Sequence, residues 1–153
     1  IQSYVESSHK DGTVLTGGKL YSHSNLDNGF FVEPTIITDL DENHPLVKSE
    51  LFCPILYIRP VKNLAEALTF ANDTEYGLTA GFFSEDQEEI DLFFNTIRAG
   101  VTYVNRRSGA TTGAWPGVQP FCGWQSSGST GKGCCGPYYV TQFMREQSRT
   151  VMT

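Results

Sequence analysis

The segment QPFCGWQSSGSTGKGCCGPYY, at positions 119–139, holds most of the residues that could carry chemistry. It combines closely spaced glycines with three cysteines, Cys122, Cys134 and Cys135, and it ends in aromatic residues. Glycines let a backbone approach a bound anion closely, and thiols can bind metals or form redox pairs. The segment is therefore a candidate phosphate cradle, metal site, redox pair, or loop that binds a ligand through its main chain.

Known phosphate-binding patterns do not fit this segment. The spacing Gly131-x-Gly133-x-x-Gly136 matches the dinucleotide fingerprint, but it follows a polar run instead of a strand, and no acidic residue stands at the required distance. The Walker pattern fails because Gly133 replaces its Ser or Thr, and Ser126 stands where its first glycine belongs. Neither pattern predicts a nucleotide site here.

Metal and redox functions are also disfavoured. The cysteines lack a C-x-x-C spacing, and the histidines, His9, His23 and His44, lie far from them in the sequence, so we predict no metal site. A disulfide between the adjacent Cys134 and Cys135 would close a strained eight-membered ring. Small thiols that fill space beside glycine are the interpretation we favour.

A main-chain site is the simpler prediction. Pro137 suits the first position of a helix, which we predict over residues 137–147. The N–H groups around the turn before it would point outward from the helix N-terminus, where carboxylates and phosphates bind. A glycine-rich connector that only turns the chain is an equal alternative at this point.

Strands and helices alternate along the chain. Runs of β-branched and aromatic residues predict strands, and apolar residues three or four apart predict helices. The predicted strands are 13–18, 30–40, 55–61 (buried), 78–84 and 101–105; one helix begins at 63 and ends between 72 and 77, and another, capped by Ser84, ends at Gly100. This order is typical of βαβ crossovers, so we predict an α/β fold with a mostly parallel sheet. Ligands collect at the carboxyl ends of such strands, which makes the loop after Asn105 a candidate site.

Composition excludes several classes of function. A net charge of −6 argues against a nucleic-acid surface. No stretch approaches the roughly 20 apolar residues of a membrane span, and no signal or lipidation motif is visible, so we predict a cytoplasmic protein with no membrane or nucleic-acid partner. With 153 residues one domain is the expectation, although IQSYVESSHKDGTVLTGG reads as a beginning in mid-domain.

Three motifs resemble, in order, those of the aldehyde dehydrogenase family. They are VEPTIITDLDENHPLVKSELFCPILYI (32–58), ANDTEYGLTAGFFS (71–84) and YVNRRSGATTGAWPGVQPFCGW (103–124). The series TTGA, VQPF, GSTGK, GPYY and REQSRTV is similar to that of L-glutamate γ-semialdehyde dehydrogenases, also called Δ1-pyrroline-5-carboxylate dehydrogenases. The resemblance implies the C-terminal part of a mostly parallel-sheet α/β catalytic domain over residues 1–140, then a helix end and oligomerisation tail over 141–153.

The resemblance implies NAD as the cofactor, which accepts a hydride as the semialdehyde is oxidised to L-glutamate. Glu50 matches the family's glutamate that hydrogen-bonds the hydroxyls of the nicotinamide ribose, and a carboxylate suits two such donors. Phe52 matches an aromatic residue that packs beside the nicotinamide. Plain core packing is the alternative for Phe52.

The resemblance also implies a substrate site. Phe121 matches the aromatic residue that walls the aldehyde tunnel, and Phe143 matches one that packs on the aliphatic part of the substrate. Cys135 and Gly136 stand at the anchor whose backbone N–H groups hold the substrate's α-carboxylate. On this interpretation the glycine-rich segment binds a carboxylate through its main chain.

The sequence departs from the family pattern in two ways. Cys53, Cys122 and Cys135 occupy positions where glycine is usual, and a Cβ is strained wherever φ must be positive. The family's nucleophilic cysteine, its general-base glutamate and the fold that binds adenosine lie upstream of the matched part. No catalytic residue is assigned, and we expect the chain alone to be inactive.

The expected partners are the remainder of the enzyme and further copies of the chain. Residues 145–153 resemble the terminal strand that joins the family's oligomerisation sheet, and such an edge seeks a partner. Two alternatives stay open: a stand-alone, non-catalytic oligomerisation or binding module, and an enzyme of the same family that acts on a different aldehyde.

Overall fold

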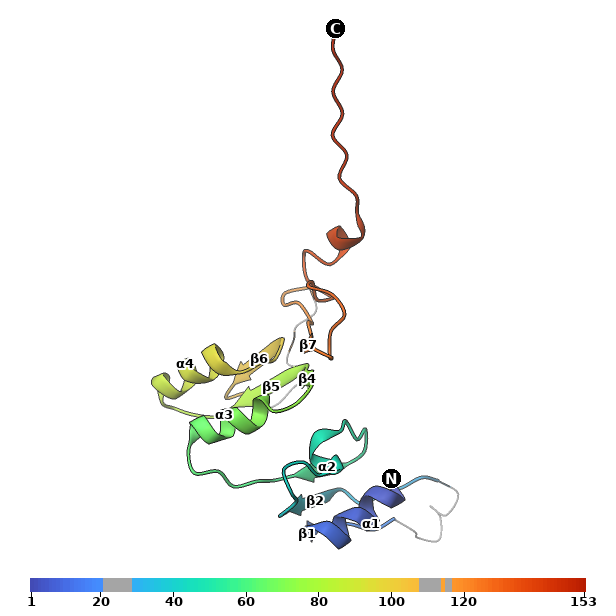
Figure 1. Cartoon of the computed structure of the whole chain (residues 1–153), viewed down its shortest axis with the longest axis vertical. Helices are drawn as coiled ribbons and strands as arrows, with labels where there is room; N and C mark the ends of the chain where they lie inside the picture. The colour runs from blue at the N-terminus through green and yellow to red at the C-terminus, as the bar shows by residue number, and fades with distance from the viewer. Residues whose placement is uncertain (21–28, 108–113, 115–116) are drawn as a thin grey trace. The chain divides into compact units, whose positions relative to one another are not determined.

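The computed structural model describes residues 1–20, 29–107, 114 and 117–153. The chain divides into two compact units, Ile1–Val61 and Lys62–Thr153, each of which mixes helices with short strands (Figure 1). The predicted α/β class is therefore confirmed. The assignment of residues 1–140 to one catalytic domain and 141–153 to a tail stays a prediction.

The first unit is a three-stranded sheet with two helices. In chain order its elements are α1 (Gln2–Asp11), β1 (Thr13–Thr16), β2 (Thr35–Thr38), α2 (Pro45–Lys48) and β3 (Ile55–Tyr57). The strand order is β1-β2-β3, antiparallel for the first pair and parallel for the second, and α1 packs beside β1 (Figure 1). The core is formed by Ile37, Leu40 and Leu46. Thr35 and Ile37 are buried because every second residue of β2 faces inward.

The second unit contains a βαβ crossover. Its elements are α3 (Leu64–Asn72), β4 (Tyr76–Gly77), β5 (Thr79–Phe82), α4 (Gln87–Thr96), β6 (Val101–Val104), β7 (Trp124–Gln125) and the 3-10 helix η1 (Val140–Phe143). Strands β5 and β6 are connected by α4 and pair with each other in parallel, whereas β4 and β7 pair antiparallel. Leu68, Phe93 and Ile97 form the core, and the ring of Phe93 stacks on Phe82 with centroids 5.1 Å apart.

Two local predictions were wrong. The cap of α4 is Asp86 and not Ser84: the Asp86 carboxylate accepts from the amides of Glu88 and Glu89, while the Ser84 hydroxyl donates to the Glu89 carboxylate at 2.6 Å. The strand predicted over 55–61 is only partly buried, because one face packs on the core and the other is exposed, with Leu56 57% exposed. Asp86, and not Ser84, caps α4 because its carboxylate can accept two backbone hydrogen bonds at once.

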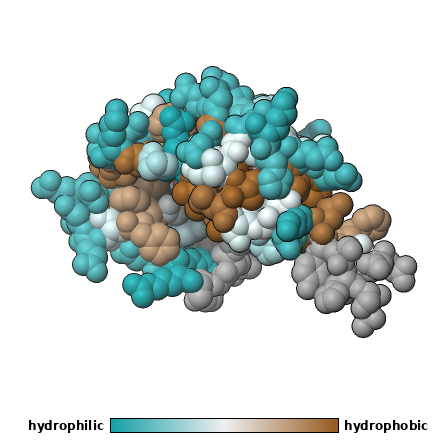
Figure 2. Space-filling model, turned by 90° about the horizontal axis from the view of Figure 1, so that it is seen from below, coloured by the Kyte–Doolittle hydropathy of each residue, from teal (hydrophilic) through white to brown (hydrophobic). Residues whose placement is uncertain are grey.

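Large apolar side chains reach the surface of both units. Figure 2 shows hydrophobic residues gathered among hydrophilic ones on one face. Phe30, Phe52 and Leu15 in the first unit, and Phe83 and Trp124 in the second, are each more than half exposed. Such surface usually marks a place where another protein segment packs.

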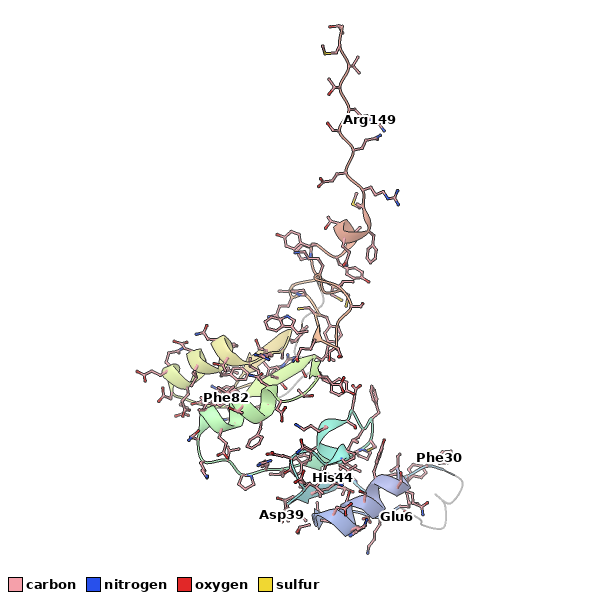
Figure 3. The ribbon with its side chains drawn as sticks, in the orientation of Figure 1. Glu6, Phe30, Asp39, His44, Phe82 and Arg149 are labelled. Carbon is pink, nitrogen blue, oxygen red and sulfur yellow. The ribbon has the colours of Figure 1, made fainter. Side chains whose placement is uncertain are left out.

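No helix in the described ranges is long and apolar enough to cross a membrane. After η1 the chain continues as an extended segment that carries Arg149 (Figure 3), and residues 144–153 pair with no strand in the described part of the chain. The strand expected here would pair with another chain, so that prediction stays a prediction.

Candidate functional site

The cysteine loop, which we define as residues 117–139, is held together by its own backbone. Phe121 and Cys134 form an isolated antiparallel bridge, in which the Phe121 amide donates to the Cys134 carbonyl at 2.8 Å. The amide of Gly117 donates to the Cys135 carbonyl at 3.2 Å, and that of Tyr139 to the Gly136 carbonyl at 3.3 Å. Three successive carbonyl groups, from Cys134 to Gly136, are thus fixed by bonds within the loop and the turn that follows it.

The amide groups of Cys135 and Gly136 remain available for a ligand. Among the described residues, no hydrogen bond has the backbone nitrogen of either residue as its donor. Cys135 is exposed and Gly136 is half-buried. Since a buried amide without a partner is costly, a half-buried donor such as that of Gly136 must face water or an acceptor from a ligand.

A cavity of about 460 Å³ is lined in part by Gly136. Its lining includes Gly136, Cys122, Trp124, Tyr138 and Lys132. The Lys132 ammonium lies 5.3 Å from the centre of the Tyr138 ring, a distance typical of a cation–π contact. The cavity therefore combines apolar walls with a cation and with at least one main-chain donor at its edge, which suits an organic anion.

The sequence reasoning missed Lys132 and Tyr138 as parts of this cavity. The GSTGK motif contains Lys132, but it was tested only against the Walker pattern, in which lysine binds phosphate. Lys132 stands in a loop whose main-chain N–H groups were predicted to bind a carboxylate, and that position was the signal that could have identified it.

The predicted helix over 137–147 was wrong. Pro137 to Tyr139 form a turn, and only Val140–Phe143 form a single 3-10 turn before the chain becomes extended at Met144. Aromatic and β-branched residues lose rotamer freedom in a helix, and this short segment is exposed, so no packing offsets that cost. No helix dipole therefore acts at the predicted anchor, which has only the amides of the turn as donors.

The four predicted substrate residues all lie in the second unit. Phe121, Cys135 and Gly136 are brought together by the bridge between Phe121 and Cys134. Phe143 lies on η1, is 68% exposed, and packs edge-on against Tyr139 with ring centres 5.4 Å apart. Neither Phe121 nor Phe143 lines the cavity beside Gly136.

Both predicted cofactor residues lie in the first unit, between α2 and β3. Glu50 is exposed, and Phe52 is 89% exposed with a left-handed φ of 47°. The alternative role for Phe52, packing in the core, does not apply to the described part of this unit. A bulky residue held in left-handed backbone with its ring in solvent is an outlier that calls for a functional hypothesis.

The three substitutions of glycine by cysteine differ in cost. Of these residues only Cys135 has a positive φ, 62°, whereas Cys53 and Cys122 lie outside the left-handed region. Cys122 gains a hydrogen bond, since its thiol donates to the Gly100 carbonyl at 3.2 Å. Only Cys135 therefore carries the backbone strain expected from the sequence.

The thiols of the cysteine loop do not form a metal site. Within the described residues no group of three or more His, Cys, Asp or Glu side chains could hold an ion. Burial raises the pKa of the Cys134 thiol, and its hydrogen bond with Cys135 adds to the shift. Cys134 is thus protonated at neutral pH.

One further polar cluster in the first unit resembles a hydrolase triad by composition only. The His44 Nε2 lies 3.3 Å from the Asp11 carboxylate, to which the Ser7 hydroxyl also donates at 3.1 Å. The other ring nitrogen of His44 accepts the amide of Leu46 at 3.2 Å and so caps α2. With Nδ1 already an acceptor, Nε2 carries the proton and cannot act as a base toward Ser7.

These features can be compared with those of known proteins. Residues 1–149 match the aldehyde dehydrogenase family, and the chain belongs to that family. Relatives named 1-pyrroline-5-carboxylate dehydrogenase, from Geobacillus sp. (strain WCH70) and Halalkalibacterium halodurans, are 35% and 36% identical over 99% of the chain. The chain spans 27% of the length of each.

Solved structures give the same result. A 1-pyrroline-5-carboxylate dehydrogenase from Thermus with bound NAD superimposes with a TM-score of 0.82 at 35% identity, covering 93% of this chain and 26% of that one. A betaine aldehyde dehydrogenase from Staphylococcus aureus in complex with NAD+ superimposes with a TM-score of 0.74 at 29% identity, covering 84% and 25%. The fold class and the resemblance stated from the sequence are confirmed.

Proposed function

We propose that the chain is a portion of an NAD-dependent dehydrogenase that oxidises L-glutamate γ-semialdehyde to L-glutamate, and that this portion binds the α-carboxylate of the substrate. The observation that carries the proposal is the pair of unused amides at Cys135 and Gly136, of which Gly136 lines a cavity that also contains Lys132. The similarity of the whole chain to relatives named 1-pyrroline-5-carboxylate dehydrogenase supports it.

The anchor works by fixed main-chain donors. Because the carbonyls of Cys134, Cys135 and Gly136 are engaged within the loop, the intervening peptide planes are held in place before a ligand arrives. Donors that need no rearrangement bind an anion at lower entropic cost. Lys132 adds a positive charge, and the apolar walls of the cavity suit the methylene groups of a glutamate skeleton.

The cofactor contact is assigned to Glu50 and Phe52. An exposed carboxylate accepts hydrogen bonds from ribose hydroxyls, and an exposed aromatic ring can pack beside a nicotinamide, so both residues fit NAD. When bound, NAD supplies the acceptor for a hydride. The nucleophile and the base are assigned to a part of the enzyme that this chain does not contain, so the chain alone should reduce no NAD in the presence of the semialdehyde.

The anchor is tested by measuring the binding of L-glutamate, the expected product, to the chain. Gly136→Pro removes the N–H donor, and Gly136→Ala keeps it while adding the same Cβ, which would lie 2.8 Å from the Cβ of Pro120. Because both variants add the same Cβ, we expect the proline variant to bind on the order of tenfold more weakly than the alanine variant, as for one hydrogen bond to a charged group. Tryptophan fluorescence, from Trp115 and Trp124, checks that the second unit stays folded.

Two results would overturn this proposal. One is equal affinity of the two Gly136 variants while both stay folded. The other is equal binding of L-glutamate and 4-aminobutyrate, which lacks the α-carboxylate.

Assembly is a separate part of the proposal. The exposed, extended segment 144–153, which has no strand partner among the described residues, is assigned to pairing with a further copy of the chain. Sedimentation of the chain and of a version ending at Phe143 tests this, with a shift toward monomer expected on truncation. A sedimentation coefficient that changes by no more than the small loss of mass would reject it.

A further inference from the structure

The thiols of the cysteine loop are not equivalent. The Cys122 thiol points to the carbonyls of Gly100 and Pro120, at 3.2 Å and 3.8 Å. The Cys135 sulfur instead lies 3.9 Å from the Cys134 sulfur, and Cys134 also contacts the Phe121 carbonyl at 3.6 Å. The loop thus contains one adjacent pair of thiols and a third thiol, that of Cys122, which bonds to carbonyl groups instead.

The backbone explains why two neighbouring side chains lie on one side. In an extended chain, successive side chains point to opposite faces. Cys134 is extended in its bridge to Phe121, but Cys135 turns into the left-handed region with φ of 62°. The bonds from Phe121 to the Cys134 carbonyl and from Gly117 to the Cys135 carbonyl hold this turn without any ligand.

Direct oxidation is not the chemistry that this geometry favours. A disulfide needs the sulfurs about 2.05 Å apart, and the ring would contain the peptide whose carbonyl is held by Phe121. Burial also keeps the Cys134 thiol protonated, which slows its attack on a disulfide. A single atom that bonds to both sulfurs spans the 3.9 Å gap with less movement.

We propose that Cys134 and Cys135 form a vicinal dithiol site for trivalent organoarsenicals, in which both sulfurs bond to one arsenic atom. Two S–H and two As–O bonds of an arsonous acid break, two As–S and two O–H bonds form, and two water molecules leave. Arsenic stays trivalent, and sulfur is not oxidised. Each thiol supplies the proton of one leaving water, so no external base or oxidant is required. Cys135 reacts first because it is exposed, and the half-buried Cys134 closes the ring.

Occupancy of this site has a consequence that rests on the proposed function. The ring that includes arsenic also contains the peptide nitrogen of Cys135, one of the two donors assigned to the substrate carboxylate. Closing the ring moves or shields that donor. Binding of L-glutamate should therefore be lost when the dithiol is capped.

Phenylarsine oxide is the probe for the test. The chain has four free cysteines, so one equivalent should leave two of the four reactive toward maleimide in the intact mass spectrum. The captured arsenical should resist 2-mercaptoethanol and be removed by 2,3-dimercaptopropanol. The reason is that two linked As–S bonds raise the affinity over that of a single bond by a factor on the order of 10² or more, and only a second dithiol can match this.

Variants identify the pair. Cys134→Ser and Cys135→Ser should each lose that resistance, whereas Cys122→Ser and Cys53→Ser should retain it. Resistance that survives in either of the first two variants, or that disappears in Cys122→Ser, would overturn the assignment. Dithiol capture that leaves L-glutamate affinity unchanged would instead reject the carboxylate anchor and leave the dithiol site intact.

Discussion

Replacing Cys135 with glycine should stabilise the second unit. A residue with a Cβ pays about 1–2 kcal/mol to adopt the left-handed conformation, and Cys135 has φ of 62°. Glycine avoids this cost, but it raises the conformational entropy of the unfolded chain, which reduces the gain in stability by about 0.4–1 kcal/mol. The thiol makes no bond to the backbone that would be lost, since its described contact is with Cys134. We therefore expect a net gain of about 0.5–1 kcal/mol.

Thermal unfolding followed by tryptophan fluorescence measures this gain. Both tryptophans of the sequence come after residue 61, so their signal reports on the second unit alone. For a unit of this size the expected rise in Tm is roughly 2–8 °C. Cys135→Ala is the matched control, because it removes the thiol and keeps the Cβ, and it should leave Tm nearly unchanged.

A second control separates backbone strain from a general preference for glycine in this loop. Cys122 has no positive φ and donates a hydrogen bond to Gly100, so Cys122→Gly should lower Tm. A rise in Tm for both glycine variants, or equal effects of glycine and alanine at position 135, would refute the strain argument.

Three further perturbations have defined outcomes. Gly100→Ala would place a Cβ against the Cys122 carbonyl, so a loss of about 1–3 kcal/mol is expected in urea unfolding, with native stability as the contradicting result. Asn72→Ala removes two side-chain bonds, of 2.9 and 2.8 Å, that join α3 to the end of α4, and it should cost about 1–2 kcal/mol by the same assay. Asp11→Asn should speed amide exchange in α2 at pH 7. Hydrogen bonds from His44 and Ser7 lower the pKa of Asp11 below 3.8. The ionised carboxylate therefore stabilises the fold above pH 3.8, and this stabilisation is lost as the pH falls through the pKa of Asp11 in the folded protein. An unchanged difference between the two proteins at pH 7 and pH 2 would contradict that assignment.

The parts of the fold that were predictable are those set by local periodicity. The crossover from β5 through α4 to β6 was predicted because alternating and helical patterns follow one another with little between them. The short helix α2 was not predicted, since four residues are too few for a period; it exists because His44 caps it and Pro45 fills its first position. Strand β7 was missed because it is defined only by its pairing with β4 across about 50 residues of sequence.

The candidate site was predictable in its residues and not in its geometry. Glycine spacing and the resemblance indicated Cys135 and Gly136, but the reason first given, a helix N-terminus, was wrong. What the structure supplies is a set of carbonyls engaged by Phe121, Gly117 and Tyr139, so that the amides between them are left over. That pattern depends on non-local bonds, which no local motif encodes.

Exposure of apolar residues connects the fold to the proposed function. Phe52, two residues after Glu50, and Leu56, in the middle of β3, both face solvent in the first unit. Isolated exposed apolar residues are ordinary. The left-handed backbone of Phe52, however, costs conformational free energy that no packing of its ring offsets until another group covers the ring. In the proposed enzyme that cover is the nicotinamide and the rest of the polypeptide. In the proposed enzyme the carboxylate anchor is held in shape by backbone bonds of the cysteine loop, whereas the surroundings of Phe52 are completed only by what packs against it.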